Sequence, residues 1–300
     1  MKTLKTISTF FAFSIALIAC AQNNDVVIKT NKLSETVYML EGQGGNIGIS
    51  VGDDGIVMID SQFAPLTPKI LAAIKAISDK PIKFLINTHW HHDHVGGNEN
   101  IKNEGAIIVA HDNVRKRMSV DQFDKYRDRE TKASPTKLPL VSFSDNITFH
   151  MNGEDIMVFH VDNAHTDGDA MIYFTNSNVL HMGDTYFQGK YPFIDLSTGG
   201  SVNGYINAVK HALMLVDDDT KIIPGHRNLS DKKELRAYLT MLETLKTRVL
   251  AEIKKGKTEK EVTNNAAITK EYTALNYGDW FINDEQIRRA FYISLKEDKN

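Results

Sequence analysis

A run of candidate metal ligands directly after one short apolar segment constrains this chain more than any other feature. Residues 82–87 have the length and composition of a buried strand, and the sequence Thr-His-Trp-His-His-Asp-His follows at once. In extended backbone, side chains two positions apart point the same way, so His89 and His91 share a face. Asp93 and His94 follow on a turn, where they can face a second ion. Imidazole and carboxylate suit zinc and other borderline divalent metals, so the run predicts a metal centre.

The composition is that of an ordinary globular protein. The chain has 300 residues, of which 42% are hydrophobic and 24% charged, enough to bury a sizeable core. Cys20 is its only cysteine, so a domain that follows it has neither an internal disulfide nor a thiolate ligand. The formal net charge is −3, and no run rich in Lys and Arg is present. A nucleic-acid partner is therefore not expected.

The first residues have the pattern of a secretory signal. Two lysines precede the apolar stretch 7–19, which is too short to span a bilayer comfortably. We expect residues 1–19 to be a signal peptide and the protein to be exported to the periplasm. The sequence Leu-Ile-Ala-Cys is similar to a bacterial lipobox, which would place a lipid anchor on Cys20 as the only link to a membrane. The alternative is cleavage after Ala21, which would release a soluble protein that starts at Gln22.

Two successive sets of strands, each followed by helices, are predicted from the spacing of the apolar residues. Strands are expected at 26–28, 37–40, 46–51, 55–60, 82–87, 106–110, 147–149, 156–161, 171–174, 179–182 and 221–223. Helices are expected at 66–78, 96–103, 202–216 and 231–255. This order predicts one α/β domain over residues 24–300, a four-layer αββα sandwich with a helical C-terminal extension from about residue 230.

Two local predictions belong to the same pattern. Ser230 is placed to cap the helix expected at 231–255. The highly charged stretch 112–137 predicts one or two exposed helices that end at the turn formed by Ser134 and Pro135. The alternative for this stretch is a movable lid over the site.

Four further motifs accompany the cluster in the order in which they occur in one known family. Asp60 closes a strand, His165 lies in Ala-His-Thr-Asp-Gly-Asp, Asp184 in Met-Gly-Asp-Thr and His226 in Pro-Gly-His. With His-x-His-x-Asp-His they resemble the metallo-β-lactamase superfamily, and the resemblance extends to about residue 228. In that family the early aspartate orients the site from behind the ligands. The resemblance therefore implies this role for Asp60.

The resemblance also implies two zinc ions, with iron or manganese as alternatives. The ligands would be His89, His91 and His165 for the first ion, Asp93, His94 and His226 for the second, and Asp184 as a bridge between the two. A hydroxide between the ions would be the nucleophile, because two cations depress the pKa of a shared water. Asp184 and Asp93 are the candidate catalytic carboxylates. Asp93 can also hand a proton to the leaving group, although ligation competes with that role.

Candidate substrate contacts follow two of the expected ligands. Tyr186, Lys190 and Tyr191 come after the bridging aspartate, on a loop that we expect to border the pocket. One of them could bind a substrate carboxylate or an oxyanion. Arg227 and Asn228 directly follow the last histidine and carry the same expectation.

Three other predictions concern neighbouring side chains. His92 lies inside the cluster, but its side chain is expected to point away from the ligands. Trp90 either lines the pocket or covers one imidazole. The aromatic residues of the C-terminal segment are expected to pack a terminal helix onto the domain, with a dimer contact as the alternative; they are Tyr272, Tyr277, Trp280 and Phe281.

The motifs also narrow the activity. The β-lactamase groups that use cysteine in the second site are excluded, and an aspartate at position 184 is the pattern of glyoxalase II, lactonases and many general hydrolases. Export disfavours glyoxalase II, whose substrate is intracellular. The resemblance therefore implies an exported dinuclear zinc hydrolase that cleaves an ester, lactone, thioester or amide of a small molecule. A persulfide dioxygenase with one iron and a phosphodiesterase on the same fold are the alternatives; the sequence predicts neither the substrate nor the oligomeric state.

Overall fold

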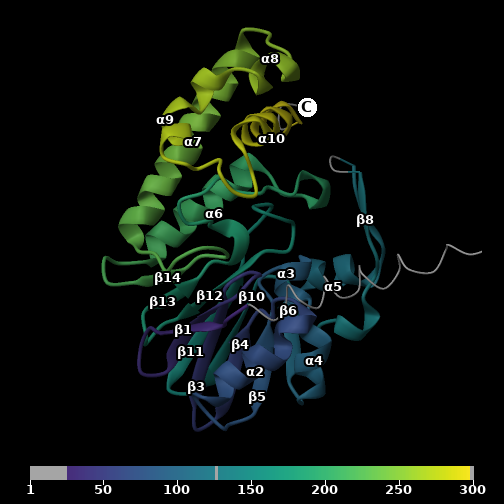
Figure 1. Ribbon diagram of the computed structural model, residues 1–300, viewed down its shortest axis with the longest axis vertical. Coiled ribbons are helices and arrows are strands. Elements are labelled where there is room, and N and C mark those ends of the chain that lie inside the picture. The colour runs from purple at the N-terminus through teal and green to yellow at the C-terminus, as the bar shows by residue number, and fades with distance from the viewer. Residues whose placement is uncertain (1–25, 126–127, 298–300) are drawn as a thin grey trace, which may run out of the picture.

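The computed structural model describes residues 26–125 and 128–297. The expected signal peptide, residues 1–19, and Cys20 lie outside these ranges. Within them, no helix is both long enough and apolar enough to cross a membrane. Two sheets are packed together with helices outside them, and the C-terminal helices gather at one end of the molecule (Figure 1).

The first sheet has seven strands in the order β1-β2-β3-β4-β5-β6-β9. The strands are β1 (Lys29–Lys32), β2 (Val37–Glu41), β3 (Ile47–Gly52), β4 (Gly55–Ile59), β5 (Ile82–Ile86), β6 (Ile107–His111) and β9 (Val141–Phe143). β4 and β5 are parallel, with Ile59 paired to Ile86 at their carboxyl ends. The residues that follow these two strands therefore start side by side.

The second sheet has five strands in the order β10-β11-β12-β13-β14. The strands are β10 (Asn146–Met151), β11 (Glu154–His160), β12 (Ala170–Phe174), β13 (Val179–His181) and β14 (Lys221–Ile223). Only β13 and β14 are parallel, with His181 paired to Ile223 at their carboxyl ends. The segments that follow them therefore also emerge together.

The inner faces of the two sheets share one buried core. Ile59 and Ile86 of the first sheet belong to the same cluster of contacting side chains as Ile172 and Val179 of the second. All four are fully buried. Burial of apolar surface between the sheets thus holds together the strand ends that will carry the site.

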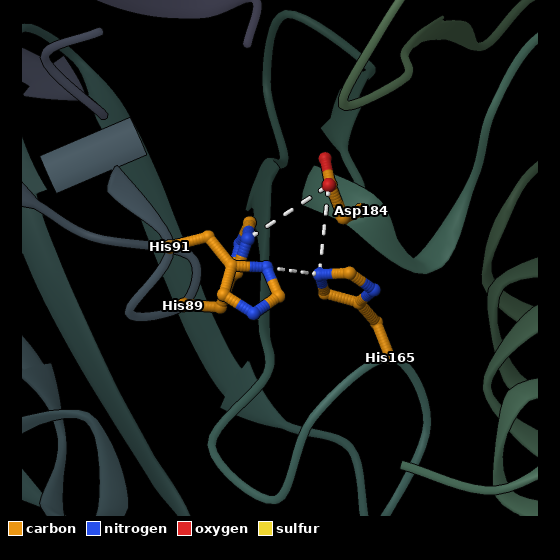
Figure 2. Close-up of side chains that lie close together, drawn as sticks. All are labelled: His89, His91, His165 and Asp184. Carbon is orange, nitrogen blue, oxygen red and sulfur yellow. Dashed lines mark hydrogen bonds and ion pairs between the residues drawn. The ribbon is translucent and has the colours of Figure 1, made fainter. Parts of the chain in front are cut away.

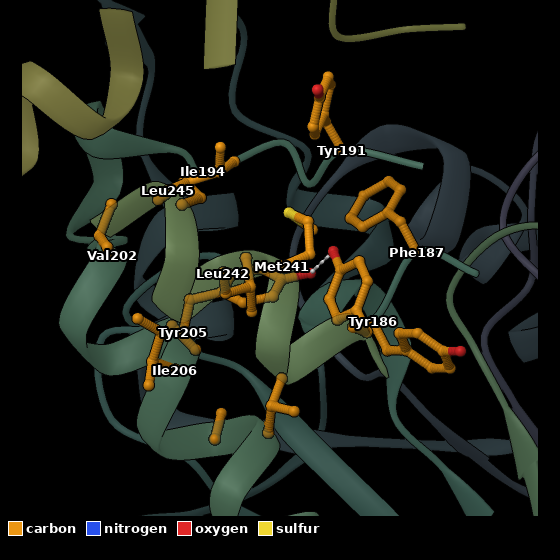
Figure 3. Packing of buried hydrophobic residues seen from close by; sticks show 14 of the residues in the cluster. Tyr186, Phe187, Tyr191, Ile194, Val202, Tyr205, Ile206, Met241, Leu242 and Leu245 are labelled. Carbon is orange, nitrogen blue, oxygen red and sulfur yellow. Dashed lines mark hydrogen bonds between the residues drawn. The ribbon is translucent and has the colours of Figure 1, made fainter. Parts of the chain in front are cut away.

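Helices flank the two sheets on their outer faces and form the C-terminal end of the molecule (Figure 1). They are α2 (Thr67–Lys75), α3 (His92–Val95), α4 (Asn98–Asn103), α5 (Asp112–Ser119), α6 (Val202–Leu215), α7 (Lys232–Lys254), α8 (Glu259–Thr263), α9 (Lys270–Ala274) and α10 (Asp284–Glu297). α2 packs Ile70 against the first sheet. Ile206 of α6 and Leu242 of α7 lie in one cluster (Figure 3), which also includes Leu180 of β13. The four layers confirm the predicted αββα sandwich.

The charged stretch 112–137 differs from its prediction in the second half. α5 ends at Ser119, where Val120 takes an extended conformation, and a hairpin of β7 (Gln122–Asp124) and β8 (Arg129–Thr131) replaces the expected second helix. A high content of charged residues does not distinguish such a short hairpin from an exposed helix, because strand formation depends strongly on the contacts of the side chains. At the N-terminal end, β1 starts at Lys29 rather than at residue 26.

The N-terminus of α7 is capped by Asp231 and not, as expected, by Ser230. An Asp231 carboxylate oxygen accepts a hydrogen bond from the Glu234 N–H at 2.8 Å. Ser230 turns inward, where its hydroxyl lies 2.7 Å from both the Tyr186 hydroxyl and a Glu234 carboxylate oxygen. Both residue types can cap a helix, so only tertiary contacts select between them.

Asp231→Ala is expected to lower the free energy of unfolding by about 1 kcal/mol, because it leaves an N–H of the first turn without its acceptor. Urea denaturation followed by circular dichroism measures this change. Asp231→Asn is the matched control, because asparagine caps as well as aspartate does. Equal losses in the two variants would contradict capping as the cause.

Candidate metal centre

All seven candidate ligands lie where strands of the two sheets end. His89 and His91 follow β5 and His94 lies in α3, while Asp184 lies in the 3-10 helix η3 (Gly183–Thr185) after β13. His165 precedes β12, and His226 follows β14. The parallel pairs β4–β5 and β13–β14 bring these segments to one edge of the sandwich. Tertiary structure thus brings together residues that lie up to 137 positions apart in the chain.

The first ligand group consists of His89, His91, His165 and Asp184, whose ligand atoms all lie within 4.8 Å of one another (Figure 2). His165 Nε2 lies 2.8 Å from His91 Nδ1. Asp184 Oδ2 lies 3.5 Å from His165 Nε2 and 3.8 Å from His89 Nε2. Three nitrogens and one oxygen thus converge on one point.

The second ligand group consists of Asp93, His94 and His226. Asp93 Oδ2 lies 3.6 Å from His94 Nε2 and 3.2 Å from His226 Nε2. The other oxygen of Asp184, Oδ1, lies 3.1 Å from His94 Nε2 and 3.4 Å from His226 Nε2. Asp184 therefore turns one oxygen to each group, which is the geometry required of a bridging carboxylate.

Metal ions fit this donor set, because several of its buried atoms lack a partner. Among the described residues, His89 Nε2, His94 Nε2 and Asp184 Oδ1 are buried and make no hydrogen bond. Leaving such an atom unpaired costs about 1–3 kcal/mol. Imidazole nitrogens with carboxylate oxygens suit zinc, iron and manganese.

Electrostatics holds the histidines of the two ligand groups in different protonation states. Burial lowers the pKa of His89 well below its usual range and that of His165 to about 4. Both therefore stay neutral, which is the form that binds metal. Burial acts in the same direction on His226, but Asp184 and Asp93 outweigh it and raise the pKa of His226 to about 9. A cation at the second group therefore competes with a proton on this histidine.

Asp60 and Thr88 orient two of the ligands from behind. The buried Asp60 carboxylate accepts hydrogen bonds from the Thr88 N–H at 2.8 Å, the Thr88 hydroxyl at 2.7 Å and His94 Nδ1–H at 2.7 Å. The Thr88 oxygen in turn lies 3.0 Å from His89 Nδ1 and can accept from it. In this arrangement both imidazoles direct Nε2 into the site.

Asp60→Asn is expected to weaken zinc binding about 10- to 100-fold, because the amide cannot accept all three hydrogen bonds and the imidazole of His94 loses its fixed tautomer. A zinc titration in competition with a chelator measures the affinity. Glu154→Gln is the control, since Glu154 is a buried carboxylate that accepts from Asn176 N–H and Ser177 N–H outside the two ligand groups. Equal zinc affinities in Asp60→Asn and in the control would contradict this role.

Asp195 is a residue that sequence reasoning missed. Its carboxylate lies 2.9 Å from His91 Nε2, which leaves Nδ1 as the ligand atom of that histidine. Burial alone would raise the pKa of Asp195, but His91 beside it lowers the pKa well below its usual range. The same loop also holds His165, because Phe193 O accepts from His165 Nδ1–H at 2.7 Å. No local motif marks Asp195, so only the path of its loop reveals the contact.

Two glycines allow the chain to approach the ligands closely. A Cβ atom at Gly225 would collide with Asp184 Oδ1, and one at Gly45 would collide with the ring of His94. Gly225 belongs to the motif that ends in His226. The motif therefore needs glycine at position 225, because any side chain there would collide with Asp184.

A cavity of about 410 Å³ opens over both ligand groups. Its lining includes the ligands His91, Asp93, Asp184 and His226, as well as Asp195. Trp90 also lines it, with its ring centroid 4.9 Å from that of His91, so both of the alternatives for Trp90 hold. His92 is exposed at the rim, 5.5 Å from the ring of Phe63, and belongs to neither ligand group.

The residues predicted to contact the substrate do not line this cavity. Tyr186 and Tyr191 belong to a buried hydrophobic cluster (Figure 3). Tyr186 lies against Ser230, and the Tyr191 hydroxyl donates to Asp284 at 2.9 Å. Lys190 pairs with Asp279 and donates to Asn276 O at 2.7 Å. The hydroxyl groups of Tyr186 and Tyr191 and the ammonium group of Lys190 thus point toward the start of α7 and the C-terminal segment. The expectation that these three residues border the pocket is therefore wrong.

The expectation that Arg227 and Asn228 contact the substrate is also wrong. Asn228 and Arg227 are exposed outside the cavity lining. In their place, Trp280 and Phe281 of the C-terminal segment line the cavity, whereas Tyr272 packs in the core as expected. Tyr277 packs against the same core. The sequence signal for Trp280 and Phe281 is their aromatic character, but the sequence does not say against which surface they lie.

Comparison with known proteins agrees with this geometry. The family model of the metallo-beta-lactamase superfamily matches residues 40–226. A hydroxyacylglutathione hydrolase of Pelagibacter ubique (strain HTCC1062) is 28% identical over 161 residues, which cover 51% of this chain and 56% of that protein. The alpha subunit of the 2,4-dinitroanisole O-demethylase of Nocardioides sp. (strain JS1661) is 23% identical over 190 residues, 62% of this chain and 53% of that one. The matches thus span little more than half the length of these two relatives.

Solved structures share the fold. A metallo-beta-lactamase from Pontibacter korlensis aligns with a TM-score of 0.59 at 20% identity, over 72% of this chain and 99% of that chain. The stereoselective inverting sec-alkylsulfatase from Pseudomonas sp. aligns with a TM-score of 0.65 at 18% identity, over 90% of this chain and 50% of that chain. The match of the family model over residues 40–226 identifies this chain as a member of the metallo-beta-lactamase superfamily.

Proposed function

We propose that this protein is a dinuclear zinc hydrolase that cleaves an ester, lactone, thioester or amide of a small molecule. The observation that carries the proposal is the position of Asp184, whose two oxygens face two separate ligand groups at 3.1–3.8 Å. The second group supplies three further ligands to which a single ion at the first group would not bind. The name of the Pelagibacter relative, a hydroxyacylglutathione hydrolase, supports hydrolysis as the reaction class.

Bound divalent cations would supply Lewis acidity, which lowers the pKa of a shared water and polarises a carbonyl. The chain's own contribution is to hold the ligands and to move a proton. Asp93 is suited to the second task, because it lines the cavity and its side chain is 29% exposed. Burial alone would raise the pKa of Asp93, but His94 and His226 lower it well below its usual range. Asp93 therefore starts ionised and can protonate a leaving group only after it has accepted the proton that the attacking water releases.

We also propose that the hydrolase is exported. Residues 1–19 would be removed as a signal peptide, Cys20 would carry the lipid anchor, and residues 24–300 would form one domain with its helical extension. The apolar run 7–19 after two lysines supports this.

Cys20→Ala is expected to move the protein from the membrane fraction to the soluble fraction, because the variant has no thiol to carry the lipid. Retention in the membrane fraction would contradict lipidation.

A hydrolysis panel with the zinc-loaded protein tests the function. We expect turnover within a set of aryl esters, lactones and thioesters, and loss of turnover in Asp184→Asn. β-Lactams and phosphodiesters complete the panel, and phosphodiester cleavage alone would favour the phosphodiesterase alternative. One iron per chain with consumption of oxygen would overturn the zinc hydrolase in favour of an oxidoreductase.

A further inference from the structure

Four aromatic side chains form a continuous row over the two ligand groups. We call Phe187, Trp280, Phe281 and Phe193 the aromatic arc. Phe187 stacks on His226 with 5.2 Å between ring centroids, and Trp280 lies 5.2 Å from the same histidine. Successive centroids along the arc are 6.0, 6.1 and 5.7 Å apart. The arc thus forms one apolar wall of the cavity.

The far end of the arc reaches the first ligand group. Phe193 stacks on His91 with 5.7 Å between ring centroids. Trp280 and Phe281 are 40% and 51% exposed, although both are large and apolar. Such residues gathered over a cavity indicate a surface that an apolar ligand covers.

A second cavity of about 130 Å³ adjoins the first at Phe193. The two cavities share Asp124, Phe193 and Asp195 as lining residues. Much of the remaining lining of the second cavity is apolar, with Ile194 and Leu196 on one side and Ile282, Ala290 and Ile293 on the other. A chain that starts at the ligand groups and passes Phe193 would therefore enter an apolar space under α10.

The charges around these cavities disfavour an anionic substrate tail. Among the lining residues that the structure describes, the larger cavity has four aspartates and neither lysine nor arginine. Arg289 lines the smaller cavity, but its Nε donates to Glu259 at 2.7 Å. A carboxylate or sulfate on the tail of the substrate would therefore meet no unpaired cation there.

We propose that the substrate carries an uncharged, extended apolar acyl chain, which lies along the aromatic arc and ends in the second cavity under α10. This inference rests on the proposed function and specifies its substrate class. The reacting carbonyl would lie at the two ligand groups, and the acyl chain would pass Phe193. Trp280 and Phe281 would then select for chain length, and the C-terminal extension would supply part of the substrate site.

A chain-length series of p-nitrophenyl esters, from acetate to decanoate, tests the inference with the zinc-loaded protein. Burial of each added methylene is worth at most about fourfold in kcat/KM, so we expect a rise of two- to fourfold per methylene until the second cavity is full. Phe281→Ala should reduce the ratio of kcat/KM for octanoate to that for acetate by about tenfold. Leu275→Ala is the control, because Leu275 is exposed in the same segment outside both cavities.

Two variants of α10 locate the end of the chain. Ala290→Leu should fill the second cavity and shorten the preferred acyl chain, whereas Ile293→Ala should enlarge the cavity and lengthen it. Because the two shifts have opposite directions, a general loss of folding cannot imitate both. Identical chain-length profiles in the two variants and the unmodified protein would overturn the position of the chain.

Binding can also be followed without turnover. The chain has two tryptophans, Trp90 and Trp280, and both line the larger cavity. Titration with 2-decanone, a ketone that has no leaving group, should therefore change the intrinsic fluorescence in a saturable way, while 2-butanone should not. Hydrolysis of acetate and decanoate esters at equal rates, with no fluorescence change, would overturn the inference but leave the hydrolase intact. Absence of hydrolysis with saturable binding of 2-decanone would overturn the hydrolase instead.

Discussion

Asp184→Asn is expected to reduce zinc affinity more than about 100-fold and to lower hydrolysis by orders of magnitude. A residue that only orients a ligand accounts for about 10- to 100-fold, and Asp184 contacts both ligand groups directly. The variant keeps the size of the side chain but removes its negative charge. Burial alone would raise the pKa of Asp184, yet the histidines around it hold the pKa well below its usual range, so this charge is present at neutral pH.

Zinc content after dialysis and kcat/KM for an aryl ester measure the effect of Asp184→Asn. Glu154→Gln again serves as the control, because it removes the charge of another buried carboxylate outside the ligand groups. Two zinc ions per chain and unchanged kcat/KM in Asp184→Asn would refute the bridging role. Loss of one ion with retention of the other would show that the two groups bind metal independently.

Removal of metal by a chelator is expected to lower the free energy of unfolding at pH 7 by at least about 4 kcal/mol. A ligand present at a thousand times its Kd stabilises the folded state by about that amount per site. The ligands His89 and His94 are at most 1% exposed, so in the metal-free protein the unpaired Nε2 atom of each remains out of contact with water. Thermal denaturation with and without chelator measures the loss.

Re-addition of zinc distinguishes one ion from two. We expect full recovery of the Tm and of the activity only at two equivalents per chain. Full recovery at one equivalent would contradict a dinuclear site, and an unchanged Tm after complete removal of the metal would contradict the link between metal binding and stability. In Asp184→Asn the shift of the Tm on chelation should be smaller than in the unmodified protein.

Local sequence patterns predicted much of the fold. Residues 82–87 were recognisable because an apolar run between polar turns is a signal contained within a few residues, and β5 occupies Ile82–Ile86. The hairpin of β7 and β8 was not recognisable, because its two strands are stabilised by each other and not by their own composition. The predicted cap of α7, Ser230, is one residue away from the observed cap, Asp231. The reason is similar, since a contact with Tyr186 turns Ser230 inward.

For the candidate site, the sequence predicted the ligand residues but not the residues that line the cavity around them. The motifs predicted seven ligands and Asp60, and the structure places the seven in two groups with Asp60 behind His94. Ligation itself stays a prediction, which the zinc measurements test. Lys190 shows where the sequence failed: its position after Asp184 suggested the pocket, but the loop turns the ammonium toward Asp279.

The sequence alone determined the kinds of ligand and their order, because each motif carries its own chemistry within a few residues of a strand end. Only the tertiary structure decided that Asp184 turns one oxygen to each group, that Asp195 supports His91, and that Trp280 and Phe281 lie over the cavity. The physical reason is distance along the chain. Trp280 lies 54 residues beyond His226, the last ligand, so its contact with the site depends on the packing of α7 to α10 and not on any local pattern.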